Sequence, residues 1–515
     1  MNRRHSFHQP LWGLILVAGA MAHPQETAFS ENTRGPSELR PPKIDPDYVA
    51  VVIPANVAPL NFRVLEPGSS FDIELQGPSG NPIKITSRRP EITIPIKAWR
   101  SLLSANRGRE YHVSITSRDA TGAITTFQAI TNAVAPVEMD GYLAYRRLNW
   151  QFSQYGSGNI GIYQRDLSTY EESEIIRVKE RKEGAATCVN CHTFFQQQPD
   201  IMVLHSRVSA TGEKPMMIAN RGKVTTVAKP FGLLSWHPSG KLLAFSQNRF
   251  SMVLHTIGRN RDVYDGAGDL GIYQIESATV VMPPAISRTD RFETWPCWSA
   301  DGKYLYFCSG PPLPLDEYKA IQYDLMRISF DERTGTWGEV EEILSSKTTG
   351  LSIAQPKISP DGNYLLFCMF PYSSFPATQP ESDLYLMDLK TMKHRRLDAV
   401  NSDRAECYHS WSSNSRWFVF SSKRRDGLLT RPYFSYVDEQ GEAHKPFLMP
   451  QEDPADFYDS LPQMLNLPEF VKGRVPYGQR TWFKAIFRPD QRIVPKDASA
   501  LTNNIPPPKA RQDTE

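Results

Sequence analysis

Residues 296–307 of this 515-residue chain read PCWSADGKYLYF, which is a strand, a tight Asp-Gly turn and a second strand. Similar phrases stand at 234–245 (LSWHPSGKLLAF), 356–367 (PKISPDGNYLLF) and 409–420 (HSWSSNSRWFVF). A turn pair between two apolar strands is a strong signal for a β-hairpin. Four such copies in one chain predict a fold that is built from internal repeats.

A further strand-like segment follows each hairpin, at 270–275, 324–328, 383–388 and 432–437. A hairpin with a return strand makes one blade of a β-propeller. Over residues 230–450 the repeats resemble TolB-type β-propellers, whose blades carry the phrase Pro-x-Trp-Ser-Pro-Asp-Gly. Two weaker units, at 160–167 and 201–219, extend the predicted propeller to six blades over residues 137–450. Unrelated hairpins in a sandwich are the alternative, and they would lack radial repetition.

The N-terminal part alternates apolar and polar residues at 71–75, 91–96 and 111–115, with turn signals at 78–81 and 119–122. This pattern predicts a small β-sandwich over residues 47–136. The region resembles a fibronectin type III or immunoglobulin-like module. The whole chain is therefore predicted to be all-β, with a sandwich ahead of the propeller.

The first residues have the pattern of an export signal. Arg3 and Arg4 precede an apolar run at 11–22 that closes on the small-residue pattern AMA. This predicts a signal peptide over residues 1–22, cleaved near Ala22, and a periplasmic or otherwise exported protein. The run is shorter than the ~20 residues of a membrane-spanning helix, so no span is expected in the mature chain. An uncleaved signal anchor is the alternative.

Segments of different character flank the predicted domains. A polar, proline-containing linker is predicted over residues 23–46, and a partly disordered C-terminal extension over residues 451–515. The chain is longer than the ~250–300 residues at which a single core stops growing, which also predicts several domains. Lys plus Arg (58) nearly balance Asp plus Glu (56), and the net charge of +2 argues against a nucleic-acid partner.

The chemistry of the chain is predicted at residues 188–192, which read CVNCH. C-x-x-C-H is the attachment motif for haem c, in which two thiols bind the haem and the adjacent imidazole reaches the iron. We therefore predict one covalent haem c on Cys188 and Cys191, with His192 as an axial ligand. A thioredoxin-like pair would need a βαβ context, and a zinc site would need a second ligand pair nearby. The sequence shows neither context.

Four further cysteines lie in or beside strand-like runs: Cys297, Cys308, Cys368 and Cys407. We expect small buried thiols there, with one or two disulfides as the alternative. Three acidic residues, Asp262, Asp265 and Asp269, are expected to form a solvated loop rather than a calcium site. His237 and His409 are expected to be structural.

The second ligand of the iron is predicted to be a histidine. His255 is the first candidate, because it lies in a long segment (248–269) inserted next to the haem-bearing blade, and such a loop can bend over its neighbour. His205 is the second candidate. If Leu204 corresponds to the last phenylalanine of each hairpin, His205 stands where the other blades carry Ser246, Cys308, Cys368 and Ser421. Met252, an open position, and a structural role for His205 are the alternatives.

An exported propeller with one haem motif resembles a group of propeller cytochromes, with the alpha subunit of hydrazine synthase as a distant comparison. This chain carries only one haem motif, so the resemblance does not extend to hydrazine chemistry. Electron transfer to or from a docked redox partner protein is the leading hypothesis. A haem enzyme acting on a small molecule and a scaffold with a structural haem are the alternatives.

Overall fold

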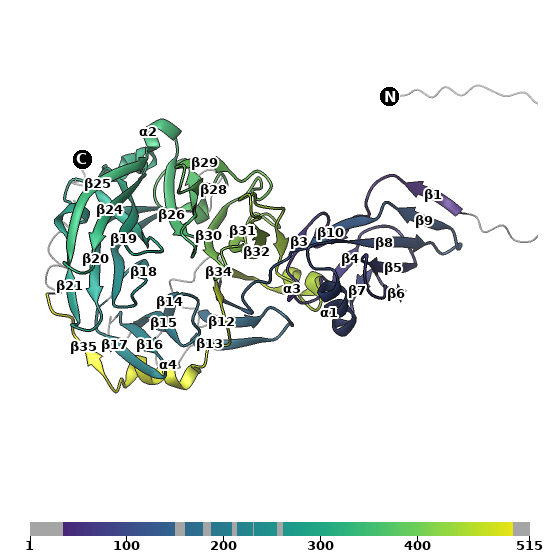
Figure 1. Cartoon of the computed structure of the whole chain (residues 1–515), viewed down its shortest axis with the longest axis horizontal. Helices are drawn as coiled ribbons and strands as arrows, with labels where there is room; N and C mark the ends of the chain where they lie inside the picture. Colours follow the sequence, from purple (N-terminus) through teal and green to yellow (C-terminus); the bar gives the residue numbers. More distant parts are fainter. Residues whose placement is uncertain are drawn as a thin grey trace, which may run out of the picture.

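The computed structural model describes residues 34–149, 160–178, 187–208, 214–229, 231–254 and 261–497. The predicted signal peptide and the last residues of the predicted extension lie outside this range. The described residues are mainly β-strands, and Figure 1 shows them as a group of N-terminal strands beside a ring of sheets. Their α-helices are short: α1 (Ile96–Ala105), α2 (Ser346–Thr349), α3 (Pro454–Ser460) and α4 (Gln479–Phe487). Within these ranges no helix is long and apolar enough to cross a membrane.

The N-terminal strands form two sheets. The larger one has the order β1-β9-β8-β10-β3, with β5 paired to β8 and β6 to β5, and the smaller one is β2-β4-β7. The strands are β1 (Arg34–Glu38), β2 (Ile44–Asp45), β3 (Val52–Ile53), β4 (Phe62–Val64), β5 (Ser70–Gln76), β6 (Ile83–Ser87), β7 (Glu91–Ile92), β8 (Glu110–Arg118), β9 (Ile124–Phe127) and β10 (Ile130–Val134). Two of them, β1 and β2, lie within the predicted linker. The predicted strand at 91–96 ends early, because α1 begins at Ile96 after Pro95.

Six further sheets form the ring, and each is named here from its innermost strand outward. Sheet 1 is β34 (Gln463–Val471), β11 (Tyr142–Asn149), β12 (Ile160–Asp166) and β13 (Glu172–Val178). Sheet 2 is β14 (Thr187–Phe194), β15 (Ile201–Val208), β16 (Met216–Asn220), β17 (Lys223–Val227) and β35 (Arg492–Ile493). Sheet 3 is β18 (Leu234–Trp236), β19 (Leu242–Leu254), β20 (Arg261–Gln274) and β21 (Thr279–Val281).

The other three sheets have the same layout. Sheet 4 is β22 (Phe292–Trp298), β23 (Tyr304–Gly310), β24 (Asp324–Asp331) and β25 (Thr336–Leu344). Sheet 5 is β26 (Ser352–Ile358), β27 (Tyr364–Phe370), β28 (Asp383–Asp388) and β29 (Lys393–Arg396). Sheet 6 is β30 (Glu406–Trp411), β31 (Trp417–Ser422), β32 (Arg431–Tyr436) and β33 (Phe447–Leu448).

The four predicted hairpins are confirmed as the first two strands of sheets 3 to 6. Their turns require a left-handed residue, and Gly240, Gly302 and Gly362 supply it with φ of +72°, +72° and +76°. In the fourth copy Ser415 takes this conformation with φ of +61°. The turn chemistry of the repeats therefore fixes where each sheet begins.

The ring closes through the C-terminal segment. The innermost strands contact one another in the order β34, β14, β18, β22, β26, β30 and back to β34. Strand β34 pairs antiparallel with β11, so a strand from the predicted extension completes the first sheet. Residues 463–471, which follow the predicted domain end at residue 450, are part of the ring, and β35 extends sheet 2.

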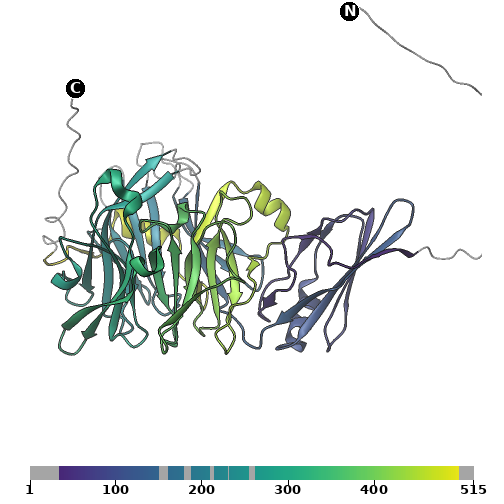
Figure 2. The same ribbon diagram turned by 90° about the horizontal axis from the view of Figure 1, so that it is seen from above.

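The N-terminal sheets pack against the ring at sheet 6 and at the β12–β13 turn of sheet 1, where the Ala58 N–H donates to the Leu167 carbonyl at 2.7 Å. Arg425 forms two hydrogen bonds to the Asp45 carboxylate, at 2.7 and 2.9 Å. The Tyr48 hydroxyl donates to the carbonyl of Leu448 at 3.3 Å. Figure 2 shows the N-terminal strands to one side of the ring, away from sheets 2 and 3.

Candidate functional site

The CVNCH segment lies on β14, the innermost strand of sheet 2. Val189 pairs with Ser206 and His192 pairs with Leu204, so two residues of β14 oppose one residue of β15 between these pairs. This is the geometry of a β-bulge, which bends a strand and changes the direction of its side chains. The motif is thus part of the innermost strand of sheet 2 itself.

Both motif cysteines are free thiols and partly exposed, while the four other cysteines are buried. The Cys188 thiol donates to Asn190 Oδ1 at 3.3 Å. Burial raises the pKa of this thiol, and the charges of Arg146 and Arg207 act in the opposite direction. The four buried cysteines are free thiols in this structure.

The His192 side chain is fully buried. Neither of its ring nitrogens has a hydrogen-bond partner among the described residues. Burial lowers the pKa of His192 to about 3, the Arg146 charge adds to this effect, and the neighbouring Ala144 backbone carbonyl acts against it. The ring contacts that of Phe194 edge-on, with 5.9 Å between the ring centroids. His192 is therefore a neutral imidazole whose nitrogens are unused, which is an uncommon and costly state for a buried polar group.

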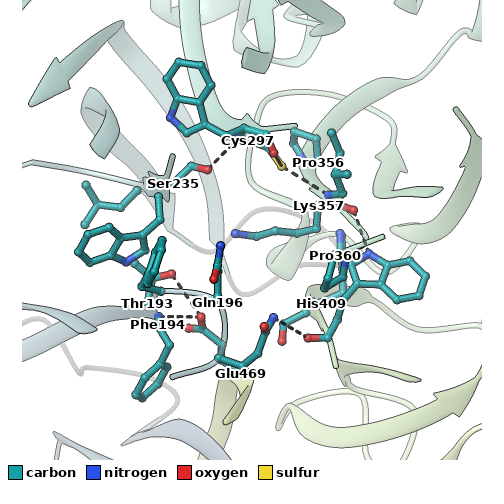
Figure 3. Close-up of a pocket in the computed structure, with 18 of the residues that line it drawn as sticks. Thr193, Phe194, Gln196, Ser235, Cys297, Pro356, Lys357, Pro360, His409 and Glu469 are labelled. Atoms are coloured by element: carbon teal, nitrogen blue, oxygen red, sulfur yellow. Dashed lines mark hydrogen bonds between the residues drawn. The ribbon is translucent and has the colours of Figure 1, made fainter. Parts of the chain in front are cut away.

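Glu469 on β34 is the acidic neighbour of His192, with 4.0 Å between Oε2 and the ring Nε2. Its Oε1 accepts hydrogen bonds from the Phe194 backbone N–H at 2.8 Å and from the Thr193 hydroxyl at 3.3 Å, as Figure 3 shows. Burial raises the pKa of Glu469 to about 7. Sequence reasoning did not select this residue, because only closure of the ring brings it beside the motif.

A cavity of about 400 Å³ opens along the innermost strands of the ring. Its lining includes Cys191, His192 and Tyr408. Glu469 and His409 also line it, and Figure 3 shows them close to each other. His409 has a structural hydrogen bond, since its Nε2 donates to the Leu366 carbonyl at 2.9 Å. The cavity therefore combines one unpartnered imidazole with one carboxyl group that titrates near neutral pH.

The structure places His205 on the opposite face of sheet 2 from His192. His192 pairs directly with Leu204, so these two side chains share a face, and the next residue of β15 points the other way. In agreement, Leu204 packs in the core between sheets 1 and 2, while Val203 packs in the core toward sheet 3. This arrangement does not bring the two imidazoles together, so it does not support His205 as the second ligand.

The predicted alignment of His205 was also one residue out of register. In sheet 4 the same bulge separates the pair Thr294 and Cys308 from the pair Cys297 and Tyr306. Matching the bulges makes Ser206 equivalent to Cys308 and His205 equivalent to Phe307. His205 thus replaces an aromatic residue; burial lowers its pKa to about 4, and its Nε2 has no partner in the described structure.

His255 lies outside the described residues, and its proposed role stays a prediction. Much of the segment around it differs from the expected loop, since β19 and β20 continue as a long paired hairpin that includes Met252. The three acidic residues expected in a solvated loop lie on β20 instead, where Asp262 and Asp265 are buried and Asp269 is partly buried. Tyrosine hydroxyls bind both buried residues, with Tyr318 at 2.7 Å from Asp262 and Tyr323 at 2.9 Å from Asp265. Among the described side chains, no cluster of His, Cys, Asp and Glu is arranged to hold a metal ion.

Comparison with known proteins shows only distant similarity. No family model and no curated protein matches the chain. Vibrio parahaemolyticus oligogalacturonate lyase is 12% identical with a TM-score of 0.33, covering 73% of this chain and 100% of that one. Kuenenia stuttgartiensis hydrazine synthase is 11% identical with a TM-score of 0.37, covering 60% of this chain and 47% of that one. The periplasmic gluconolactonase of Pseudomonas aeruginosa is 13% identical with a TM-score of 0.32, covering 60% of this chain and 97% of that one. These are β-propeller-like proteins.

Proposed function

We propose that this protein is an exported monohaem c-type cytochrome, with one haem bound covalently by Cys188 and Cys191 and His192 as an axial ligand of its iron. The observation that carries the proposal is the state of His192, a buried neutral imidazole with both nitrogens unpartnered. A neutral imidazole is the form that binds a metal, and such a bond would offset the cost of burying it. Two free thiols complete the motif, Cys191 in the bulge and Cys188 just before it.

The surrounding chain has features suited to hold such a group. Phe194 contacts the His192 ring, and Leu204 on β15 lies directly opposite His192. Both neighbours limit the orientations of the imidazole. The ring of sheets is proposed to be a six-bladed TolB-like propeller, preceded by a fibronectin III-like sandwich, with the haem on its second blade. When bound, haem c supplies a centre that gains and loses one electron.

The role proposed for this centre is electron transfer to or from a docked redox partner protein. Covalent attachment keeps the cofactor on the protein, and the partly exposed cysteines lie at the boundary between the core and solvent. A haem near a surface can exchange electrons without an entry path for substrate. The partner would meet the ring rather than the N-terminal sheets, which contact sheet 6.

The test is the covalent haem itself. The exported protein, produced together with haem-attachment machinery, is expected to retain one haem per chain after acid denaturation. The double variant Cys188→Ser/Cys191→Ser should lose it. The matched controls Cys308→Ser and Cys407→Ser alter buried thiols away from the motif and should keep it. A wild-type protein without acid-stable haem would refute the proposal.

A second candidate function is catalysis on a small molecule, and the cavity favours it. Glu469 lies 4.0 Å from His192 in a space of about 400 Å³, and burial raises the pKa of this carboxyl group to about 7, the range of a general acid or base. Such an enzyme needs an open position on its iron. Binding of carbon monoxide to the reduced protein without displacement of a protein ligand would favour catalysis, and a six-coordinate low-spin spectrum would favour electron transfer.

A further inference from the structure

The innermost strands of several sheets carry a bulge at equivalent positions. In sheet 4, Trp295 and Pro296 lie between two register pairs of β22 and β23, so two residues oppose one. The same irregularity lies at Gln355 in sheet 5, at Tyr408 in sheet 6 and at Leu467 of β34 in sheet 1. It matches the bulge of β14 in sheet 2. A bulge changes the direction of side chains, and it is common beside active sites.

The first residue of four of these bulges has a left-handed backbone. The φ angles are +54° at Trp295, +58° at Gln355, +50° at Tyr408 and +51° at Leu467. Positive φ is uncommon for residues other than glycine, and such residues gather at active sites and ligand clamps. All four line the cavity of about 400 Å³. The strained positions of the innermost strands therefore mark this cavity as a candidate binding site.

Lys357 supplies an unpaired charge to the cavity. It lies on β26 directly after the bulge of sheet 5, and it belongs to the lining. Figure 3 shows its side chain extending into the cavity, toward Gln196. Lys357 is partly buried, and its ammonium group forms no ion pair and no hydrogen bond with any residue that the structure describes. An anion in the cavity would offset the cost of removing this charge from water.

The charged residues of the lining indicate the class of ligand. Among the described residues around the cavity, Lys357 and Lys472 are the cations and Glu469 is the acid. The Phe194 N–H and the Thr193 hydroxyl donate to Glu469 Oε1, which holds this carboxyl group toward β14. One excess positive charge suits a carboxylate better than the nearly double charge of a phosphate ester.

Apolar groups form another part of the lining. They include Leu467 and three prolines, which occupy the second bulge position in sheets 1, 4 and 5: Pro468, Pro296 and Pro356. A proline ring is rigid and brings no N–H group. The volume of about 400 Å³ lies within the range of small-molecule sites. Rigid apolar walls beside one free cation suit an organic acid with a flat apolar body.

We propose that this cavity binds a small organic acid, and that the Lys357 ammonium group holds its carboxylate. The acid's apolar body contacts the prolines of the bulges. This site goes beyond electron transfer and does not depend on the haem, because Lys357 lies on sheet 5 and the haem motif on sheet 2. It also names a ligand class for the second candidate function.

The test is equilibrium dialysis of the full chain with radiolabelled benzoate as the probe. Benzamide, the neutral counterpart, is expected to compete about tenfold less well, because it lacks the charge that Lys357 binds. Lys357→Met should weaken benzoate binding by about tenfold and make the two compounds compete equally. Lys357→Arg keeps the charge and should recover most of the affinity. Absence of benzoate binding, or equal binding in Lys357→Met, would overturn the proposal.

The variants are matched for folding and for charge. Lys357→Met removes no side-chain hydrogen bond, and the backbone carbonyl that accepts from Trp411 Nε1 is retained. Lys303→Met removes a lysine whose side chain is 74% exposed, and it should bind benzoate as wild type does. Lys472→Met tests the other lysine of the lining. Loss of binding there, with none in Lys357→Met, would contradict the assignment, as would stronger competition by inorganic phosphate than by acetate at equal ionic strength.

A haem has carboxylates of its own, so a second arm separates the two sources. Dialysis is repeated on the chain with covalent haem and on the same chain made without attachment machinery. Benzoate binding to both forms, weakened by Lys357→Met, supports a free organic acid. Binding only to the haem-free form shows that the haem occupies the site, which overturns the free-acid assignment. A chain that never gains acid-stable haem refutes the proposed function alone, and the benzoate result then stands by itself.

Discussion

The Nε2 atom of His192 lies 4.0 Å from Oε2 of Glu469, although one residue is on β14 of sheet 2 and the other is on β34 of sheet 1. The contact is not a conventional ion pair. Burial lowers the pKa of the imidazole to about 3 and raises that of the carboxyl group to about 7, so the imidazole is uncharged around neutral pH. The cavity therefore has a neutral imidazole, His192, next to a carboxyl group, Glu469, that can exchange a proton near neutral pH.

Replacing His192 with leucine is expected to leave the stability of the haem-free protein unchanged or to raise it by up to about 1 kcal/mol. An unpartnered polar ring gives way to an apolar group, so no hydrogen bond is lost. His409→Leu is the matched comparison. It removes the donor to the Leu366 carbonyl and should cost about 1–3 kcal/mol. Urea unfolding measures both, and a large loss for His192→Leu would mean that the ring has a partner.

Glu469→Ala should destabilise the protein by about 1–3 kcal/mol, because the buried N–H of Phe194 loses its acceptor. Glu469→Gln keeps an amide oxygen at this position and should cost clearly less. Denaturant unfolding of the two variants tests the assignment. Equal losses would show that charge, rather than the hydrogen bond to Phe194, gives Glu469 its structural role.

His205→Phe is expected to be neutral or to stabilise by about 1 kcal/mol, since it replaces a buried, partly unpartnered imidazole with the residue type found in the equivalent place of sheets 3 to 6. The absorption and electron-paramagnetic spectra of the haem-loaded variant should match wild type. A change of spin state on this substitution would restore His205 as an iron ligand and contradict the pairing of β14 with β15.

Asp265 predicts a specific pH dependence. Burial raises its pKa from 3.8 to about 6, against hydrogen bonds from Tyr323, Asn248 and Ser374 that favour the charged form. The folded state thus holds this proton more tightly than the unfolded state does, so the contribution of Asp265 to stability falls as pH rises from about 4 to 6. The loss amounts to about 3 kcal/mol, and it is complete above the folded pKa.

The matching experiment compares Asp265→Asn with wild type by urea unfolding from pH 4 to 7. Asparagine cannot ionise, so the difference in unfolding free energy between the two proteins should shift in favour of the variant across pH 4 to 6 and then level off. A difference that is constant with pH would show that Asp265 titrates normally.

Local signals in the sequence predicted the hairpins, because an Asp-Gly turn and its left-handed glycine act over a few residues, as at Gly302 and Gly362. The same reasoning failed at 91–96, where Pro95 ends the strand and precedes α1. It failed again at Asp262 and Asp265, whose tyrosine partners Tyr318 and Tyr323 lie in the connection between β23 and β24. Several acidic residues close together in the sequence favour a solvated loop, and only the tertiary packing shows that these two are buried.

The candidate site was predicted in part. CVNCH is a contiguous signal, so its residues could be selected directly from the sequence. The bulge between Val189 and His192 could not be predicted, because the segment TCVNCHTF has no regular alternation in which an added residue would be noticed. The bulge nevertheless shifts the register of every equivalent position. Glu469 was missed for another reason. Strand β34 pairs with β11 across most of the chain, and no local pattern encodes that partner.

The pairing of β34 with β11 also sets an order of assembly. Sheet 1 stays incomplete until residues 463–471 have been synthesised, and β34 then lies against β14, where Glu469 comes within 4.0 Å of the buried His192 ring. The wall of the cavity beside His192 is therefore completed only when the last strand of the ring has paired.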